Sequence, residues 1–134
     1  MPGMEAASSY TDLRRQEAIS PKRLYAVDAV FAPDSPAVEI APLTDLAVRA
    51  VESGGGHVLD ASHVIFPNGA ITLVLILAES HLSIHTWPEE SLIAIDLFSC
   101  GAIDGQRVIE ELTGGLALTR VNVTQVARGI GETG

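Results

Sequence analysis

Hydrophobic residues along the chain gather in short apolar runs, separated by two stretches of helical periodicity. The runs predict five strands, at 22–31, 57–66, 71–78, 92–98 and 116–126. One helix is predicted by five apolar residues that share a single face: Leu43, Leu46, Ala47, Ala50 and Val51. The glycines at 54–56 are expected to end this helix. A second helix is predicted at 104–112, before two further glycines.

This order of elements predicts an α/β (α+β) fold, a two-layer sandwich with a mainly antiparallel sheet and two helices on one face. Asn68-Gly69 is a hairpin signal, so the second and third strands should be antiparallel neighbours. The runs at 71–78 and 92–98 show little polar alternation, which is typical of strands that are covered on both faces. Because two helices cover one face only, we expect the other face to pack against a second copy of the chain, in a homodimer.

The length of 134 residues suits one domain. We expect a single domain at 22–130, a flexible N-terminal tail at 1–21 with a helical turn near 11–18, and a short C-terminal tail at 131–134. Hydrophobic residues make up 47% of the chain, which is enough for a sizeable core.

The formal net charge of −9, with basic residues scattered along the chain, argues against a nucleic-acid or anionic-membrane surface and fits a cationic small molecule. The longest apolar run is too short to span a bilayer, and the N-terminus lacks a secretory signal pattern. Cys100 is the single cysteine, so the chain holds neither a disulfide framework nor a cysteine metal cluster. We expect a cytoplasmic protein without a metal.

The segment 77–89 follows the most apolar run and concentrates reactive side chains. At Glu79–Ser80, a serine hydroxyl beside a strained peptide carbonyl can attack that carbonyl and convert the amide into an ester. β-Elimination and hydrolysis then cut the chain and leave a pyruvoyl group, which can trap an amine substrate and accept electrons as CO2 leaves. For an isolated serine after a strand, a turn-forming role is the more common one.

The stretch Ala78-Glu-Ser-His-Leu-Ser-Ile-His-Thr-Trp-Pro-Glu89, with Asp96-Leu-Phe-Ser-Cys-Gly101 after it, resembles the prokaryotic S-adenosylmethionine decarboxylases. These are pyruvoyl enzymes that cleave themselves at a Glu-Ser bond, and the resemblance extends from about Leu24 to Ile130. It implies that Ser80 becomes the pyruvoyl group that forms a Schiff base with the substrate. It also implies that Glu79 becomes the new C-terminus of a β chain, which stays together with the α chain.

The resemblance implies two further catalytic residues. His85 matches the histidine that accepts a proton during processing, and Cys100 matches the donor that protonates the substrate carbon after CO2 leaves. Phe66, Trp87 and Glu89 match residues of the substrate pocket, where aromatic rings can hold an adenine or a sulfonium and a carboxylate can bind ribose. Core positions for the two aromatic residues, and a solvated turn for the acid, remain comparable alternatives.

The chain departs from the family pattern at several positions. Thr72 and Leu73 stand where the family usually has Ser and Gly. Thr72 keeps the hydroxyl that supports processing, although β-branching restricts its rotamer. Val64 occupies the position of a family histidine, and His63 lies one step earlier, on the other face of a strand. After Glu89 the sequence Glu90-Ser91-Leu92 replaces aromatic residues and glycine. We therefore expect complete self-cleaving machinery beside an altered substrate pocket.

The leading hypothesis is a self-cleaving, pyruvoyl-dependent decarboxylase that converts S-adenosylmethionine into the aminopropyl donor for spermidine biosynthesis. One alternative is the same chemistry on another amino acid, such as ornithine or arginine. A second alternative is a non-catalytic paralogue that stays uncut and serves as a dimer partner. These hypotheses differ in whether the chain is cut between residues 79 and 80, and in which carboxylate it releases as CO2.

Overall fold

The computed structural model of the chain describes residues 21–130. Except for Pro21, the tails expected at 1–21 and 131–134, including the helical turn near 11–18, lie outside the described residues. The elements are, in order, β1 (Lys22–Phe31), η1 (Pro36–Val38), α2 (Ile40–Ser53), β2 (Val58–Ile65), β3 (Ile71–Leu77), β4 (Ser80–Trp87), η2 (Pro88–Glu90), β5 (Leu92–Cys100), α3 (Gly105–Gly115) and β6 (Leu118–Arg128).

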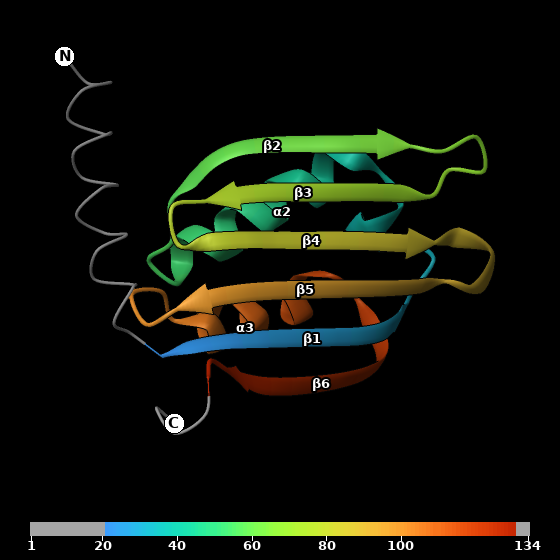
Figure 1. The fold of residues 1–134 in the computed structure, drawn as a ribbon. Coiled ribbons are helices and arrows are strands. Elements are labelled where there is room, and N and C mark those ends of the chain that lie inside the picture. Colours follow the sequence, from blue (N-terminus) through green and yellow to red (C-terminus); the bar gives the residue numbers. More distant parts are fainter. Residues whose placement is uncertain (1–20, 131–134) are drawn as a thin grey trace, which may run out of the picture.

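The strands form one antiparallel sheet in the order β2-β3-β4-β5-β1-β6. Figure 1 shows both helices, α2 and α3, packed against the same face of this sheet. The predicted two-layer α/β (α+β) sandwich is therefore confirmed, and so is the antiparallel pairing of β2 with β3 around Asn68-Gly69. The strand order places the first and last strands of the fold beside each other at one edge of the sheet.

The prediction of five strands was wrong, because the reactive segment itself forms an additional strand, β4, so that the described residues contain six. Its residues alternate: Leu82, Ile84 and Thr86 are buried, whereas the polar residues between them are partly or fully exposed. This period of two is typical of a strand with one face on the core. The many polar side chains made the segment resemble a loop in the sequence. Their spacing at every second position was the signal by which a strand could have been predicted. The reactive side chains therefore lie within the sheet.

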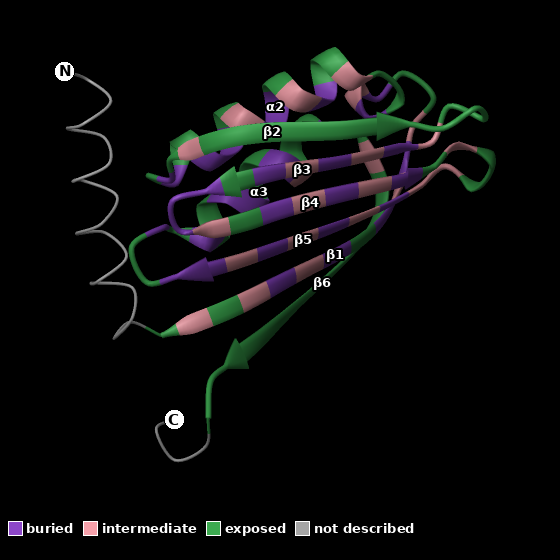
Figure 2. Cartoon of the chain, turned by 45° about the horizontal axis from the view of Figure 1, so that its top comes forward, coloured by how far each residue is buried: buried purple, intermediate pink, exposed green. Residues whose placement is uncertain are grey.

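The core lies between the sheet and the helices. Alternate residues of the central strands point into it and are fully or almost fully buried: Leu73, Leu75, Leu82, Ile84, Ile93, Ile95 and Leu97. From the helices come Leu43, Ala47 and Val51 of α2 with Val108 and Leu112 of α3. Figure 2 shows this alternation as bands of buried and intermediate residues along the central strands, whereas the edge strands β2 and β6 are mainly exposed.

Hydrogen bonds hold the end of α2 and the start of α3 together. Gly54 follows α2, and its carbonyl accepts a hydrogen bond of 2.9 Å from the backbone N–H of Asp104. The side chain of Asp104 caps α3 by accepting from the backbone N–H of Arg107 at 3.1 Å. These contacts hold the start of α3 against the end of α2, close to the ends of β1 and β5.

The sheet face away from the helices is not covered by any helix of the described residues. It carries apolar and polar side chains in similar numbers, including Val74, Ile76, Ser83, Ala94, Asp96 and Phe98. Ile76 of β3 keeps 46% of its surface exposed, although its strand is central to the fold. The packing of this open face against a second copy remains a prediction. Within residues 21–130, neither helix is long and apolar enough to cross a membrane.

Gly105, the first residue of α3, gives a testable packing constraint. A Cβ at this position would lie 2.3 Å from Cε1 of Tyr25, whose ring is buried against the helix. We expect Gly105→Ala to destabilise the chain by about 1–3 kcal/mol, because the buried ring has little room to move. Gly114→Ala in the last turn of the same helix meets nothing within 4 Å and should be neutral or stabilising by up to about 1 kcal/mol. Equilibrium urea unfolding of both variants measures the difference; equal stabilities would contradict the tight packing at Gly105.

Candidate active site

The residues that the sequence analysis singled out fall into two clusters near opposite ends of β4. The first cluster, which we call the Ser80 end, contains Glu79, Ser80 and Cys100. The second, the His85 end, contains Thr72 and His85 with the proposed pocket residues Phe66, Trp87 and Glu89. The register of the sheet sets this division, because β4 begins at Ser80 and ends at Trp87.

The turn between β3 and β4 is a two-residue hairpin loop of Ala78 and Glu79, with Leu77 and Ser80 as the closing pair. Such short loops normally need residues that tolerate positive φ, such as Asn and Gly. Neither is present here, and Ser80 has a φ of 149°. Positive φ in a residue other than glycine is a strained conformation that persists only where the surroundings enforce it. The strain lies at the predicted cleavage bond, Glu79–Ser80.

The Ser80 hydroxyl has a neighbour to which the sequence analysis assigned no role. Oγ of Ser80 lies 3.3 Å from Nδ1 of His81. The imidazole of His81 in turn lies beside the ring of Phe98 on β5, with 6.0 Å between the ring centroids. His81 is exposed, and Ser80 is partly exposed on the end of its strand. The serine hydroxyl is therefore within reach of a ring nitrogen and of incoming molecules.

Glu79 is fully buried, which the sequence did not suggest for an acid in a tight turn. Its carboxylate accepts a hydrogen bond of 2.9 Å from the backbone N–H of His57, and its second oxygen lies 2.6 Å from Nδ1 of the same residue. His57 was not singled out from the sequence. No local pattern could have identified it, because the contact joins residues 22 positions apart.

Cys100 ends β5 at the same end of the sheet as Ser80. His81 pairs with Phe98, and Cys100 lies two residues further along β5. The cysteine is buried and borders a cleft of about 410 Å³ that extends past Ser99 to Gly105 at the start of α3. Two of the predicted catalytic residues, Ser80 and Cys100, are thus brought together by the pairing of β4 with β5.

At the His85 end, Thr72 and His85 face each other across β3 and β4. Oγ1 of Thr72 lies 3.1 Å from Nδ1 of His85. The ring of His85 also lies beside that of Trp87, with centroids 6.4 Å apart. The threonine that departs from the family pattern therefore keeps a polar contact with the predicted processing histidine.

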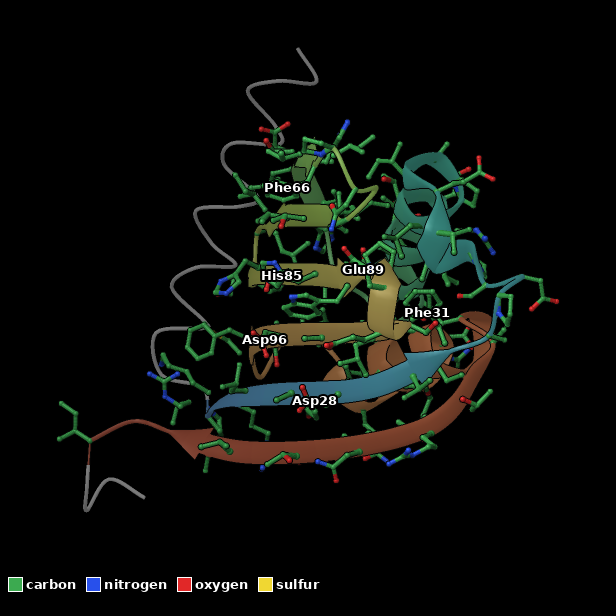
Figure 3. All side chains as sticks on the ribbon, turned by 90° about the vertical axis from the view of Figure 1, so that its right-hand side faces the viewer. Asp28, Phe31, Phe66, His85, Glu89 and Asp96 are labelled. Carbon is green, nitrogen blue, oxygen red and sulfur yellow. The ribbon has the colours of Figure 1, made fainter. Side chains whose placement is uncertain are left out.

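The three pocket residues lie at the same end of the sheet. Phe66 follows β2 and Trp87 ends β4, and both side chains are about half exposed, so neither anchors the core of this chain. Glu89 lies in η2 and accepts a hydrogen bond of 2.8 Å from Nδ2 of Asn68. That hydrogen bond lowers the pKa of the Glu89 carboxyl below its ordinary value, with a smaller contribution from a backbone bond. Figure 3 labels Phe66 after β2, His85 on β4 and Glu89 in η2.

The two clusters do not meet within one chain. Ser80 and His85 are five positions apart on the same strand, which corresponds to about 16 Å at ~3.3 Å per residue. Within one copy, His85 is therefore too far from Ser80 for direct contact, and the roles assigned to Ser80, His85 and Cys100 stay predictions. Among the described residues, no group of three or more His, Cys, Asp or Glu side chains could hold a metal ion.

The fold and these residues define a two-layer sandwich protein with its reactive groups near both ends of β4. Residues 24–129 match the sequence model of the S-adenosylmethionine decarboxylase family, and the chain belongs to this family. The resemblance identified from the sequence is thereby confirmed.

Similar proteins carry the same family name. The "S-adenosylmethionine decarboxylase proenzyme 2" of Bacillus cereus is 40% identical over 86 residues, which cover 63% of this chain and 70% of the relative. A proenzyme of Thermotoga maritima is 43% identical over 86 residues, 63% of this chain and 65% of the relative. Among solved structures, the adenosylmethionine decarboxylase of Aquifex aeolicus superposes with a TM-score of 0.73 at 27% identity, covering 84% of this chain and 94% of that one.

Proposed function

We propose that the chain is a proenzyme that cleaves itself between Glu79 and Ser80 and then decarboxylates S-adenosylmethionine, giving the aminopropyl donor for spermidine synthesis. The observation that carries this proposal is the positive φ of Ser80, which directly follows a two-residue turn without glycine or asparagine. Strain at this bond raises the energy of the intact peptide, and so favours the rearrangement that removes it. Membership of the family and the names of the relatives support the reaction and the substrate.

The cleavage requires only groups of the chain and one water molecule. Oγ of Ser80 attacks the carbonyl carbon of Glu79, the C–N bond breaks, and the hydroxyl proton passes to the freed amine. A base then removes the α-proton of residue 80, the Cβ–O bond breaks, and Glu79 leaves as a carboxylate. Water converts the resulting dehydroalanine into a pyruvoyl group and ammonia. We assign the base to His85, with Thr72 supporting it through the 3.1 Å contact.

A pyruvoyl group at residue 80 supplies a ketone that can bind the amino group of the substrate and act as an electron sink. The surroundings fit such a group, because Ser80 is partly exposed and Cys100 borders a cleft at the same end of the sheet. We assign to Cys100 the donation of the proton that replaces the departing carboxyl group. The buried position of its thiol limits competition from water.

The pocket residues suit a cationic nucleoside substrate. The half-exposed rings of Phe66 and Trp87 offer π faces for an adenine or a sulfonium. The lowered pKa of Glu89 keeps its carboxylate ionised, so that it accepts hydrogen bonds from ribose hydroxyls. The net charge of −9 attracts a cation to the protein as a whole.

We further propose that the active site is completed by a second copy of the chain. His85 lies about 16 Å from Ser80 along β4, which is too far for proton transfer, and Thr72 lies opposite His85 on β3. A two-fold related copy, packed over the open face with its strands reversed, would bring its own His85 end over the Ser80 end. The apolar side chains of the open face, such as Val74, Ile76 and Phe98, suit such an isologous contact.

The first prediction concerns the intact length of the chain. We expect the mature protein to consist of fragments 1–79 and 80–134, the second with a blocked N-terminus because a ketone has replaced its amine. Ser80→Ala should remain a single chain of 14.1 kDa, since the attacking hydroxyl is absent. Denaturing mass spectrometry measures both. An uncut wild-type chain with an ordinary serine at residue 80 would support the non-catalytic paralogue instead.

The second prediction concerns the substrate. Carboxyl-labelled S-adenosylmethionine should release labelled CO2, whereas labelled ornithine and arginine should not. Cys100→Ala should still cleave itself but release CO2 about 10²–10⁴-fold more slowly, because it lacks the proton donor. Turnover of ornithine or arginine in place of S-adenosylmethionine would show that the altered pocket has changed the substrate.

The third prediction concerns the sharing of the site. His85→Ala should cleave itself slowly when produced alone, and Ser80→Ala should not cleave at all. When the two variants are produced together, a mixed dimer holds one site with Ser80 from one copy and His85 from the other. We expect the His85→Ala chain to be cut faster in this mixture, which denaturing gels of differently tagged chains can measure. A cleavage rate unaffected by the Ser80→Ala chain would rule out a shared site.

A further inference from the structure

The turn that contains the predicted cleavage bond is fixed to the start of β2 by one residue, His57. The backbone N–H of Ala78 donates to the carbonyl of His57 at 2.9 Å. The backbone N–H of His57 donates to Oε1 of Glu79 at 2.9 Å, and Oε2 of Glu79 lies 2.6 Å from Nδ1 of the imidazole. We call this set of three contacts the His57 clamp.

The burial of Glu79 makes the clamp necessary. The Glu79 side chain is 1% exposed, whereas that of His57 is 52% exposed. A carboxylate removed from water is strongly destabilised unless its oxygens accept hydrogen bonds or meet a positive charge. His57 supplies a partner for each oxygen, and both partners come from the same residue. In this position, both oxygens of the Glu79 carboxylate have a hydrogen-bond partner.

The clamp holds one side of the cleavage bond while the sheet holds the other. Ser80 pairs with Leu77 on β3, and the next residue, His81, pairs with Phe98 on β5. With both sides fixed, rotation about the bonds between Glu79 and Ser80 cannot relax the φ of 149°. A strained backbone conformation persists only when its surroundings over-determine it in this way.

We propose that His57 is a positioning residue for self-cleavage, which acts through the Glu79 side chain. By fixing the Glu79 carboxylate, His57 holds the Glu79 carbonyl carbon in the geometry that Oγ of Ser80 attacks. This inference rests on the proposed self-cleavage and adds to it a residue outside the segment 78–101. Loss of the imidazole donor slows the shift of the acyl group from nitrogen to oxygen, and leaves the later elimination step unchanged.

The test follows the cleavage of freshly synthesised full-length chains in a cell-free pulse–chase experiment. His57→Leu removes the side-chain donor, whereas His57→Asn places an amide nitrogen close to the position of Nδ1. We expect His57→Leu to slow cleavage by about 10- to 100-fold, as small misplacements of reacting groups do. His57→Asn should recover most of the rate. His63→Leu, which removes another exposed histidine of β2, should leave the rate unchanged.

A second readout separates the acyl shift from elimination. In a His85→Ala background, elimination is slow and the ester should accumulate, so that hydroxylamine cuts the chain at residue 79. Adding His57→Leu should lower the fraction that hydroxylamine cuts, and adding His57→Asn should restore it. A purely structural role for His57 would lower the melting temperature without this pattern, and melting of all variants in a Ser80→Ala background measures that contribution.

The outcomes distinguish the clamp from the proposed function. If the wild-type chain cleaves itself and His57→Leu cleaves at the same rate, the clamp is refuted and the proposed function stands. If the wild-type chain never cleaves, the proposed function fails and the clamp with it. If His57→Leu does not fold, His57→Gln replaces it, because its amide nitrogen lies beyond the Nδ1 position. Cleavage slower than that of His57→Asn then supports the clamp, and equal cleavage refutes it.

Discussion

The backbone at Ser80 is the constraint on which the chemistry of this protein depends. A two-residue turn of Ala78 and Glu79 closes the β3–β4 hairpin without glycine or asparagine, and the positive φ falls on the serine. Such a conformation is unfavourable by itself, so its energy must come from the packing around it. The fully buried residues of β3, β4 and β5 provide that packing, and the contacts of Glu79 with His57 extend it to the turn.

The placement of both helices on one side of the sheet has a second consequence. The opposite face carries His81, Ser83, His85 and Trp87 of β4 without cover from any helix of the described residues. Five positions along β4 separate Ser80 from His85, which corresponds to about 16 Å. One copy therefore holds all the parts of the proposed site without joining them.

The departures from the family pattern differ in how far they change side-chain contacts and the direction of side chains on the sheet. Thr72 replaces a serine, yet its hydroxyl still reaches Nδ1 of His85, because the register places the two residues directly opposite each other. His63 pairs with Leu73 and Val64 with Thr72, so the one-step shift does place the histidine and the valine on opposite faces, as strand geometry requires. The contact between residues 72 and 85 is thus present with threonine in place of serine, whereas valine stands at position 64 in place of the histidine of the family pattern.

The sequence alone determined the layered architecture, the extents of both helices to within a few residues, and the motif from Ala78 to Glu89. These follow from local periodicity and from short stretches of side chains, which a linear pattern contains. It did not determine that the reactive segment is a strand, because polar residues on its uncovered face resembled a loop. Nor could it show the burial of Glu79 against His57, or the distance between Ser80 and His85. Those features depend on which strands become neighbours and in what register, and only the packed sheet decides that.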